Sequence, residues 1–243
     1  NKTLSFPLKA DKYTFFKLEI TELIDNKQKP QLAELSIDAS TELPYSDYTR
    51  TLDIDNAIHT VMYKENGITF KREYFMSYPD NVMVMRLTSD SKKGKLSRII
   101  SLESLHTDKT ITADSHTITM TGYPTPVSGD KRVGDAWKNG LKYAQQLVVK
   151  NKGGKISVVD GTKLKVEDAD EIIVLMSAAT NYVQCMDDSY NYFSQEDPLE
   201  KVQAMLHKVA DKKYTALLAT HQKDYHSLYD RMRLNLGNLP EAP

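Results

Sequence analysis

Hydrophobic and polar residues alternate along residues 46–87, and this pattern predicts consecutive β-strands joined by tight turns. Asn66 and Gly67 separate two of the alternating runs. An Asn-Gly pair at such a place favours a type I′ hairpin, because both central residues of that turn need a positive φ angle. A second turn is expected at 78–81, where Pro79 fixes its own φ and cannot donate a hydrogen bond to a neighbouring strand. The stretch therefore predicts the beginning of an antiparallel sheet.

The alternation returns between residues 96 and 179, in short runs with a turn signal between each pair. These runs, rich in Thr, Ile and Val, cover 96–102, 110–113, 117–121, 141–150, 155–159 and 163–166. A last run, 172–179, is apolar almost throughout and predicts a central strand that is buried on both faces. Many short strands at close spacing indicate an antiparallel β-sandwich, which we assign to residues 46–195.

The hydrophobic period changes to that of a helix after the sandwich. Asp197 suits the N-cap, Pro198 suits the first helical position, and Glu200 follows the cap by three residues, as in a capping box. The apolar residues of this first predicted helix fall on one face: Leu199, Val202, Met205, Leu206 and Val209. A second helix is predicted over 214–232. Residues 196–243 are therefore expected to form a short two-helix linker.

Residues 1–45 make up a strand-rich leading segment in this domain organisation. Two strand-like runs, 13–20 and 31–37, are separated by a polar loop. Residues 1–37 resemble the end of a discoidin-like, galactose-binding domain, and this resemblance implies the last strands of a jelly-roll-like module.

The composition is that of an ordinary globular protein, with 40% hydrophobic and 27% charged residues among 243. The net charge of −1, and the lack of a basic stripe with interleaved aromatic residues, argue against nucleic acid as a partner. No apolar run approaches the roughly 20 residues that a membrane-spanning helix needs, so no membrane span is expected. The single cysteine, Cys185, excludes an internal disulfide, and we interpret it as a small buried side chain.

Four segments resemble glycoside hydrolase family 95, the inverting α-L-fucosidases with some α-L-galactosidases. They are TRTLDIDNAI (49–58), KREYFMSYPDNVMVMRL (71–87), LKYAQQLVVKNKGG (141–154) and LLATHQKDYHSLYDRMRLNLG (217–237). The resemblance implies a mainly β fold, an antiparallel β-sandwich of the super-sandwich type, and a helical linker toward a catalytic helical barrel. It also implies two partners, which are that barrel in the same parent chain and a glycan ending in L-fucose or L-galactose. Finally, it implies an exported protein of the periplasm or cell surface of a bacterium.

The resemblance places the catalytic acid and base on loops of the barrel, which we expect beyond the 243 residues. Inversion needs these two groups on opposite sides of the sugar, roughly 6.5–9.5 Å apart. No catalytic residue is therefore assigned, and this chain alone is expected to be inactive. His221 and Asp224 resemble an acid–base pair, but their place on an amphipathic helix favours packing with a side-chain hydrogen bond. The six histidines show no metal-ligand spacing, and neither a metal nor a cofactor is expected.

Three residues are candidates for direct contact with a sugar: Trp137, Asn181 and Tyr182. Aromatic faces stack on the apolar faces of sugars, and polar side chains bind the hydroxyl groups. Trp137 belongs to the longest predicted loop, 122–140, and the other two residues follow the buried strand. The alternative is that these side chains pack a loop or the seam between the sandwich and the linker.

Two functions stay open from the sequence. The chain is either a non-catalytic N-terminal domain that supports the barrel and the substrate cleft of an α-L-fucosidase-like enzyme, or a stand-alone carbohydrate-binding module. Exposed apolar surface on the linker helices would favour the first function, because it would mark the surface for a missing partner. A closed polar surface with one aromatic groove would favour the second.

Overall fold

The computed structural model describes residues 45–91, 96–124, 140–184, 192–234 and 237. The chain divides into two units, 1–44 and 45–243, and all the described residues belong to the second unit. The predicted strands at 13–20 and 31–37, and the resemblance of residues 1–37, lie outside the described residues. Trp137 and Cys185 lie outside them as well.

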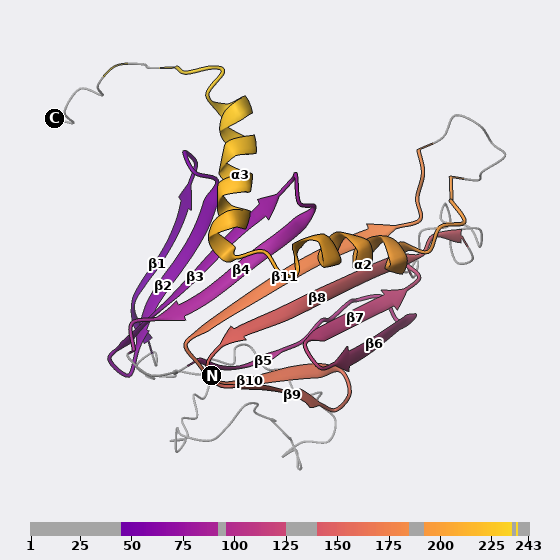
Figure 1. The fold of residues 1–243 in the computed structure, drawn as a ribbon, viewed down its shortest axis with the longest axis horizontal. Coiled ribbons are helices and arrows are strands. Elements are labelled where there is room, and N and C mark those ends of the chain that lie inside the picture. Colours follow the sequence, from indigo (N-terminus) through magenta and orange to yellow (C-terminus); the bar gives the residue numbers. More distant parts are fainter. Residues whose placement is uncertain (1–44, 92–95, 125–139, 185–191, 235–236, 238–243) are drawn as a thin grey trace, which may run out of the picture. The chain divides into compact units, whose positions relative to one another are not determined.

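Eight strands form one antiparallel sheet in the order β1-β2-β3-β4-β11-β8-β7-β6 (Figure 1). Their bounds are β1 Tyr45–Asp53, β2 Ile58–Glu65, β3 Ile68–Ser77, β4 Val82–Ser89, β6 Lys109–Asp114, β7 Thr117–Gly122, β8 Tyr143–Lys152 and β11 Glu171–Thr180. The apolar strand β11 pairs with β4 on one side and with β8 on the other. Its residues Ile172 and Leu175 point to opposite faces, and both are fully buried. The prediction of a central strand buried on both faces is confirmed.

The run β1–β4 is the predicted series of consecutive strands, and its turns have the predicted geometry. Asn66 and Gly67 have φ angles of 50° and 76°, and the strands on either side pair directly from Glu65 to Ile68. In the next turn, the backbone N–H of Asn81 donates to the carbonyl oxygen of Tyr78 at 3.2 Å. These short turns fix the register, and the register decides which side chains face each side of the sheet.

A second, smaller sheet covers part of one face of the large sheet. It contains β5 Leu96–Ile100, β9 Lys155–Val159 and β10 Lys163–Ala169 in the order β5-β10-β9. Leu96, Leu164 and Val166 of the small sheet are buried against residues of the large sheet such as Ile118 and Ile172. The two sheets therefore form the antiparallel sandwich that the sequence predicts.

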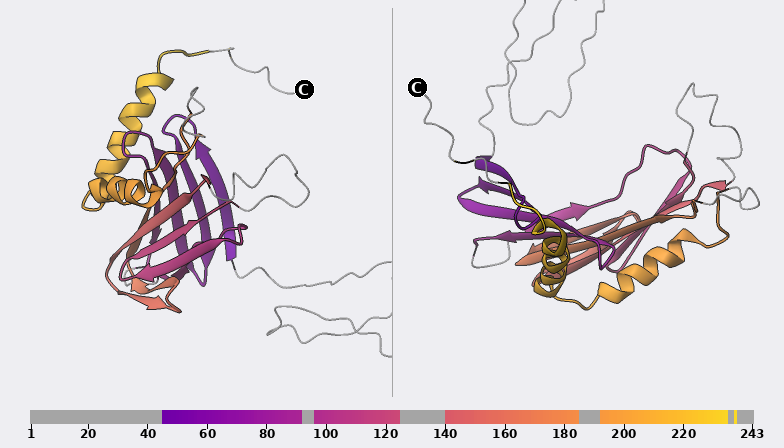
Figure 2. Two further views of the ribbon diagram at one scale, coloured as in Figure 1. Left: turned by 90° about the vertical axis from the view of Figure 1, so that its right-hand side faces the viewer. Right: turned by 90° about the horizontal axis from the view of Figure 1, so that it is seen from above.

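Two helices, α2 Pro198–Val209 and α3 Tyr214–Tyr229, lie on the opposite face of the large sheet (Figure 2). Asp197 Oδ1 accepts a hydrogen bond from the N–H of Leu199 at 3.0 Å, which confirms the predicted N-cap. Val202 and Leu206 of α2 are buried against β8 and β11. The second helix ends at Tyr229, earlier than its sequence pattern predicts. No helix among the described residues is long and apolar enough to cross a membrane.

Candidate functional site

Asn181, one of the predicted sugar-contact residues, is buried directly after β11. Its Oδ1 accepts a hydrogen bond from the N–H of Lys142 at 2.7 Å. Its Nδ2 donates to the carbonyl oxygens of Gly140 at 2.8 Å and Ser194 at 3.3 Å. The amide thus joins three backbone segments, and a sugar hydroxyl would have to compete with these hydrogen bonds. Sugar contact by Asn181 stays a prediction.

Tyr182 has a different environment, although it is the next residue. It is 47% exposed and forms an isolated antiparallel bridge with Phe193. Its ring therefore has a surface that a ligand can reach, whereas the Asn181 amide is used inside the fold. Trp137, the third candidate, lies outside the described residues. Sugar contact by Tyr182 also stays a prediction.

One face of α3 is attached to the turn between β1 and β2. Four contacts of 2.5–3.1 Å each join a helix side chain to one turn residue: His221 to Ala57, Gln222 to Asn56, Tyr225 to Ile54 and Tyr229 to Asp55. The turn is itself fixed, because Asp53 Oδ1 accepts from the N–H of Asn56 at 3.1 Å. The side-chain and backbone hydrogen bonds from Asn56 lower the pKa of Asp53. The face of α3 that carries these four side chains and the turn 54–57 therefore form one joined surface.

His221 sits at the buried end of this joined surface. Its ring lies 4.8 Å from the Phe75 ring in a stacked arrangement, and its Nε2 lies 3.0 Å from the carbonyl oxygen of Ala57. The imidazole thus contacts the β1–β2 turn, not Asp224. The structure agrees with packing and a hydrogen bond for His221, as its place on the helix favours.

Exposed apolar side chains lie on α3 and on the turn that it contacts. Leu228 and Met232, on or just after the last turn of α3, are 59% and 85% exposed. Ile54 of the β1–β2 turn is 60% exposed. Leu52 is 67% exposed, but it lies opposite His59 in the β1–β2 ladder and therefore faces the other side of the sheet from α3. We call Ile54, Leu228 and Met232 the apolar end. Figure 1 shows the C-terminal end of α3 and the β1–β2 turn at the same end of the large sheet, and Tyr225 joins the two directly through Ile54.

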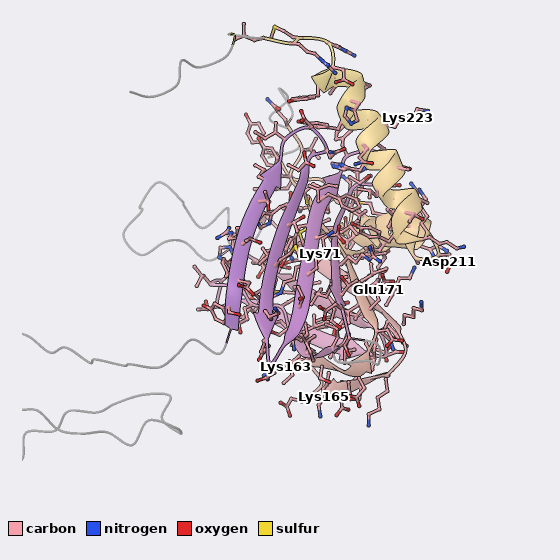
Figure 3. All side chains as sticks on the ribbon, turned by 90° about the vertical axis from the view of Figure 1, so that its left-hand side faces the viewer. Lys71, Lys163, Lys165, Glu171, Asp211 and Lys223 are labelled. Carbon is pink, nitrogen blue, oxygen red and sulfur yellow. The ribbon has the colours of Figure 1, made fainter. Side chains whose placement is uncertain are left out.

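A partly buried charge cluster attaches the start of α3 to the sheet. The Arg86 Nε donates to Glu171 Oε2 at 2.6 Å, and its Nη1 lies 3.5 Å from Glu73 Oε2. The same guanidinium lies over the ring of Tyr214, the first residue of α3. Burial, and then the nearby charge of Glu73, raise the pKa of Tyr214 to about 12. Figure 3 shows Glu171 beside the junction of the two helices, where Asp211 is also labelled.

Among the described residues, no group of three or more His, Cys, Asp and Glu side chains could hold a metal ion.

Sequence reasoning missed a cluster of Tyr63, Arg72 and Arg98 on the face that the small sheet covers in part. Arg72 and Arg98 both donate to the hydroxyl of Tyr63. The Asn66-Gly67 hairpin sets Arg72 opposite Val61 and so brings it close to Tyr63, which the sequence alone could have predicted. Arg98 comes from β5 in the other sheet, and no local signal points to this meeting.

Residues 11–185 match a family model described as "Glycosyl hydrolase family 65, N-terminal domain". The chain is 32% identical over 206 residues to Alpha-L-fucosidase 2 of Arabidopsis thaliana. It is 28% identical over 211 residues to "Probable alpha-fucosidase A" of Aspergillus niger. These alignments cover 79% and 84% of this chain, but 24% and 25% of the two relatives. The chain therefore spans about a quarter of the length of the curated relatives it matches.

A solved structure from the human microbiome, provisionally named a kojibiose phosphorylase, has a similar fold. The TM-score is 0.52 at 10% sequence identity, over 76% of this chain and 25% of that chain. At this identity the likeness concerns the fold alone.

Proposed function

The chain belongs to the N-terminal domains of glycosyl hydrolase family 65. On this basis we propose that it supports the catalytic barrel of a larger α-L-fucosidase. The family match and the α-fucosidase relatives confirm the resemblance to the N-terminal region of such enzymes. Membership of family 95 is part of the proposal, and the four resembling segments support it. The terminal L-fucose or L-galactose of a glycan is then the substrate of the whole enzyme.

The apolar end carries this proposal. Ile54, Leu228 and Met232 expose large apolar side chains where a helix and a hairpin are fixed together. Exposed apolar surface of this kind marks the docking place of a partner. In the proposal, the partner is the helical barrel of the same parent chain. The sandwich holds α3 in place, and α3 with the β1–β2 turn orients the barrel.

The chemistry of inversion explains which part of the enzyme catalyses and which part supports. One carboxylic acid protonates the leaving oxygen, and one carboxylate activates a water molecule on the other side of the sugar. Both groups belong to the barrel in this proposal. The contribution of this chain is to hold the barrel loops at the separation that the reaction needs, since a small displacement of catalytic groups costs much of the rate.

The first test is release of L-fucose from 2′-fucosyllactose. We expect no release by the 243-residue chain and release by the longer parent enzyme that contains it. Release by the 243-residue chain would place a catalytic pair inside it and overturn the supporting role. If neither protein releases L-fucose, but the parent acts on a glycan ending in L-galactose, the supporting role stands and the preferred sugar changes.

The docking surface has its own test in the parent enzyme. We expect Leu228→Ser with Met232→Ser to lower fucose release and the melting temperature of the parent, because both side chains leave the proposed interface. The same pair should leave the stability of the 243-residue chain within about 0.5 kcal/mol, as for ordinary surface changes. Leu105→Ser is the matched control, because Leu105 is fully exposed outside the apolar end. An equal effect of control and test variants in the parent would contradict docking at this end.

The rival function is a stand-alone carbohydrate-binding module. The apolar end argues against it, since an independent module has no partner to cover that surface. The exposed ring of Tyr182 is compatible with both functions. Export to the periplasm or cell surface of a bacterium stays a prediction.

A further inference from the structure

A groove of about 590 Å³ lies on the sheet face opposite the helices, along β1–β3, with Arg98 of β5 at one side. Four tyrosines line it: Tyr45, Tyr48, Tyr63 and Tyr74. This volume lies within the usual range for small-molecule sites, which runs from about 300 to 1,000 Å³. The groove has no role in the docking of a barrel at the apolar end, so its chemistry needs a separate explanation.

Three arginines also line this groove. Arg72 Nη2 and Arg98 Nη2 each donate to the hydroxyl oxygen of Tyr63 at 3.1 Å. Arg50 lines the same groove and is exposed. Among the described residues, none of the three forms a salt bridge, and Glu65 is the single carboxylate that lines the groove.

Two guanidinium groups that converge on one neutral oxygen repel each other. Arg98 Nη1 also donates to the carbonyl oxygen of Ser97 at 2.8 Å. An anion placed between the two guanidinium groups would remove their repulsion and would accept the remaining N–H groups. The planar guanidinium suits carboxylate, sulfate and phosphate groups, because it can offer two parallel N–H donors. The cluster therefore has the donor arrangement of an anion-binding site.

The tyrosines indicate what the anion is attached to. Tyr45 and Tyr48 are 40% and 52% exposed, and their ring centroids lie 5.9 Å apart at a tilt of 49°. Tilted, exposed rings at the rim of a groove offer apolar faces to a sugar ring and hydroxyl groups to its polar edge. A nucleic acid strand would need a longer positive surface than three arginines, and the net charge of the chain is −1.

We propose that the groove of Tyr45, Tyr48, Tyr63, Arg50, Arg72 and Arg98 binds an acidic saccharide, a sugar that carries a carboxylate or a sulfate. The anionic group lies between Arg72 and Arg98, and the sugar ring lies against Tyr45 and Tyr48. Arg50 adds attraction from the rim. The site is non-catalytic and would keep the domain on a charged glycan.

The test is a titration of the 243-residue chain, followed by nuclear magnetic resonance and calorimetry. The probes are methyl β-D-glucuronide for a carboxylate, N-acetylglucosamine 6-sulfate for a sulfate, and methyl β-D-glucoside as the neutral match. We expect at least one acidic probe to bind ten times or more tightly than the neutral one. The difference should shrink as sodium chloride is added, because salt screens the charges. The two acidic probes decide between carboxylate and sulfate.

Variants locate the site. Arg98→Gln and Arg50→Gln should each reduce binding of the acidic probe by about fivefold or more. Tyr48→Ala should weaken the binding of all the saccharide probes, acidic and neutral. Lys223→Gln makes the same change of charge at an exposed position of α3, on the other side of the large sheet (Figure 3), and should leave binding unchanged. Arg50→Gln is informative even if Arg98→Gln unfolds the chain, because Arg50 is exposed.

Three results would overturn the proposal: no probe binds, the acidic and neutral probes bind equally, or Lys223→Gln weakens binding as much as Arg50→Gln. None of them bears on fucose release by the parent enzyme, so failure of this site and failure of the proposed function are distinguishable.

Discussion

The guanidinium of Arg86 lies 4.5 Å from the ring centroid of Tyr214, and this contact joins β4 to the first residue of α3. The same arginine is held by Glu73 and Glu171 on neighbouring strands. The start of the helix therefore rests on a charge that the sheet has already fixed in place. This arrangement makes the position of α3 sensitive to changes inside the sheet.

Replacement of Arg86 by methionine should destabilise the chain. The change leaves the carboxylates of Glu73 and Glu171, whose side chains are 12% and 23% exposed, without their shared partner. Loss of one partner of a buried ion pair costs about 3–5 kcal/mol, and the partial exposure here lowers our expectation to about 2–3 kcal/mol. Urea denaturation of Arg86→Met measures the loss.

Lys71→Met is the matched control for Arg86→Met, because Lys71 also pairs with Glu73 but is 40% exposed at its side chain. Surface pairs contribute about 0–1 kcal/mol, so this change should cost less than about 1 kcal/mol. Equal losses in the two variants would mean that Arg86 does not anchor the helix.

Tyr214→Phe should keep or slightly raise the free energy of unfolding at pH 7. The hydroxyl of Tyr214 is buried and has no well-aligned hydrogen-bond partner among the described residues. Removal of such a group relieves a desolvation cost, so we expect a gain of about 0–1 kcal/mol. A loss of more than about 1 kcal/mol in urea denaturation would show that the hydroxyl has a stabilising partner.

The same variant should change the response to alkaline pH. The pKa of Tyr214 is raised from 10.0 to about 12 in the folded chain, chiefly by burial. Between these two values the unfolded chain loses this proton while the folded chain keeps it. The contribution of this bound proton to the free energy of unfolding is complete below pH 10 and is lost as the pH rises to 12. Denaturation curves from pH 8 to 12 should therefore fall more steeply for the natural chain than for Tyr214→Phe, and parallel curves would refute the shift.

Asn181→Ala should destabilise the chain by about 2–3 kcal/mol, because it removes a buried amide that bonds three partly buried backbone groups, those of Gly140, Lys142 and Ser194. Asn181→Asp should cost at least as much, since a carboxylate would face two carbonyl oxygens. Tyr182→Ser is the control and should cost less than about 1 kcal/mol at its exposed position. Thermal denaturation compares the three, and an Asn181→Ala chain as stable as the control would remove the structural role.

Gly154→Ala and Gly161→Ala form a pair that separates backbone strain from collision. Both glycines have a positive φ, 63° and 64°, so an added side chain costs about 1–2 kcal/mol at each. At Gly161 the added Cβ enters open space, whereas at Gly154 it would collide with the backbone of Glu167 and Ala169. Urea denaturation should show a loss at least about 2 kcal/mol larger for Gly154→Ala. Similar losses would mean that the backbone of Glu167 and Ala169 moves aside to make room for the new methyl group.

The elements that the sequence predicts are those with a local cause. The Asn66-Gly67 turn needs positive φ angles, β11 is apolar on both faces, and the cap of α2 lies in four consecutive residues around Asp197 and Pro198. Each of these signals acts over a few residues, and each appears in the structure where it is predicted.

The parts that the sequence does not predict depend on residues far apart in the chain. The meeting of Arg98 with Tyr63 requires the small sheet to cover the large one. The attachment of Tyr225 to Ile54 requires α3 to lie across the sheet, a path that helix periodicity does not specify. The sequence suggests a surface position for Asn181, which stands beside a tyrosine after a strand, and only the fold shows that backbone groups surround it.

The pairing of β4 with β11 imposes an order of events on folding. Arg86 pairs with Ile173, so this edge of β4 stays unpaired until the ribosome has added more than 80 further residues. During synthesis, the edge of β4 carries unpaired N–H and C=O groups, and such an edge readily joins another chain. Closing so large a loop is also slow, because the chain loses conformational entropy before the contact between distant residues can stabilise it. Expression of this chain should therefore depend on chaperones and on low temperature more than its final stability would suggest.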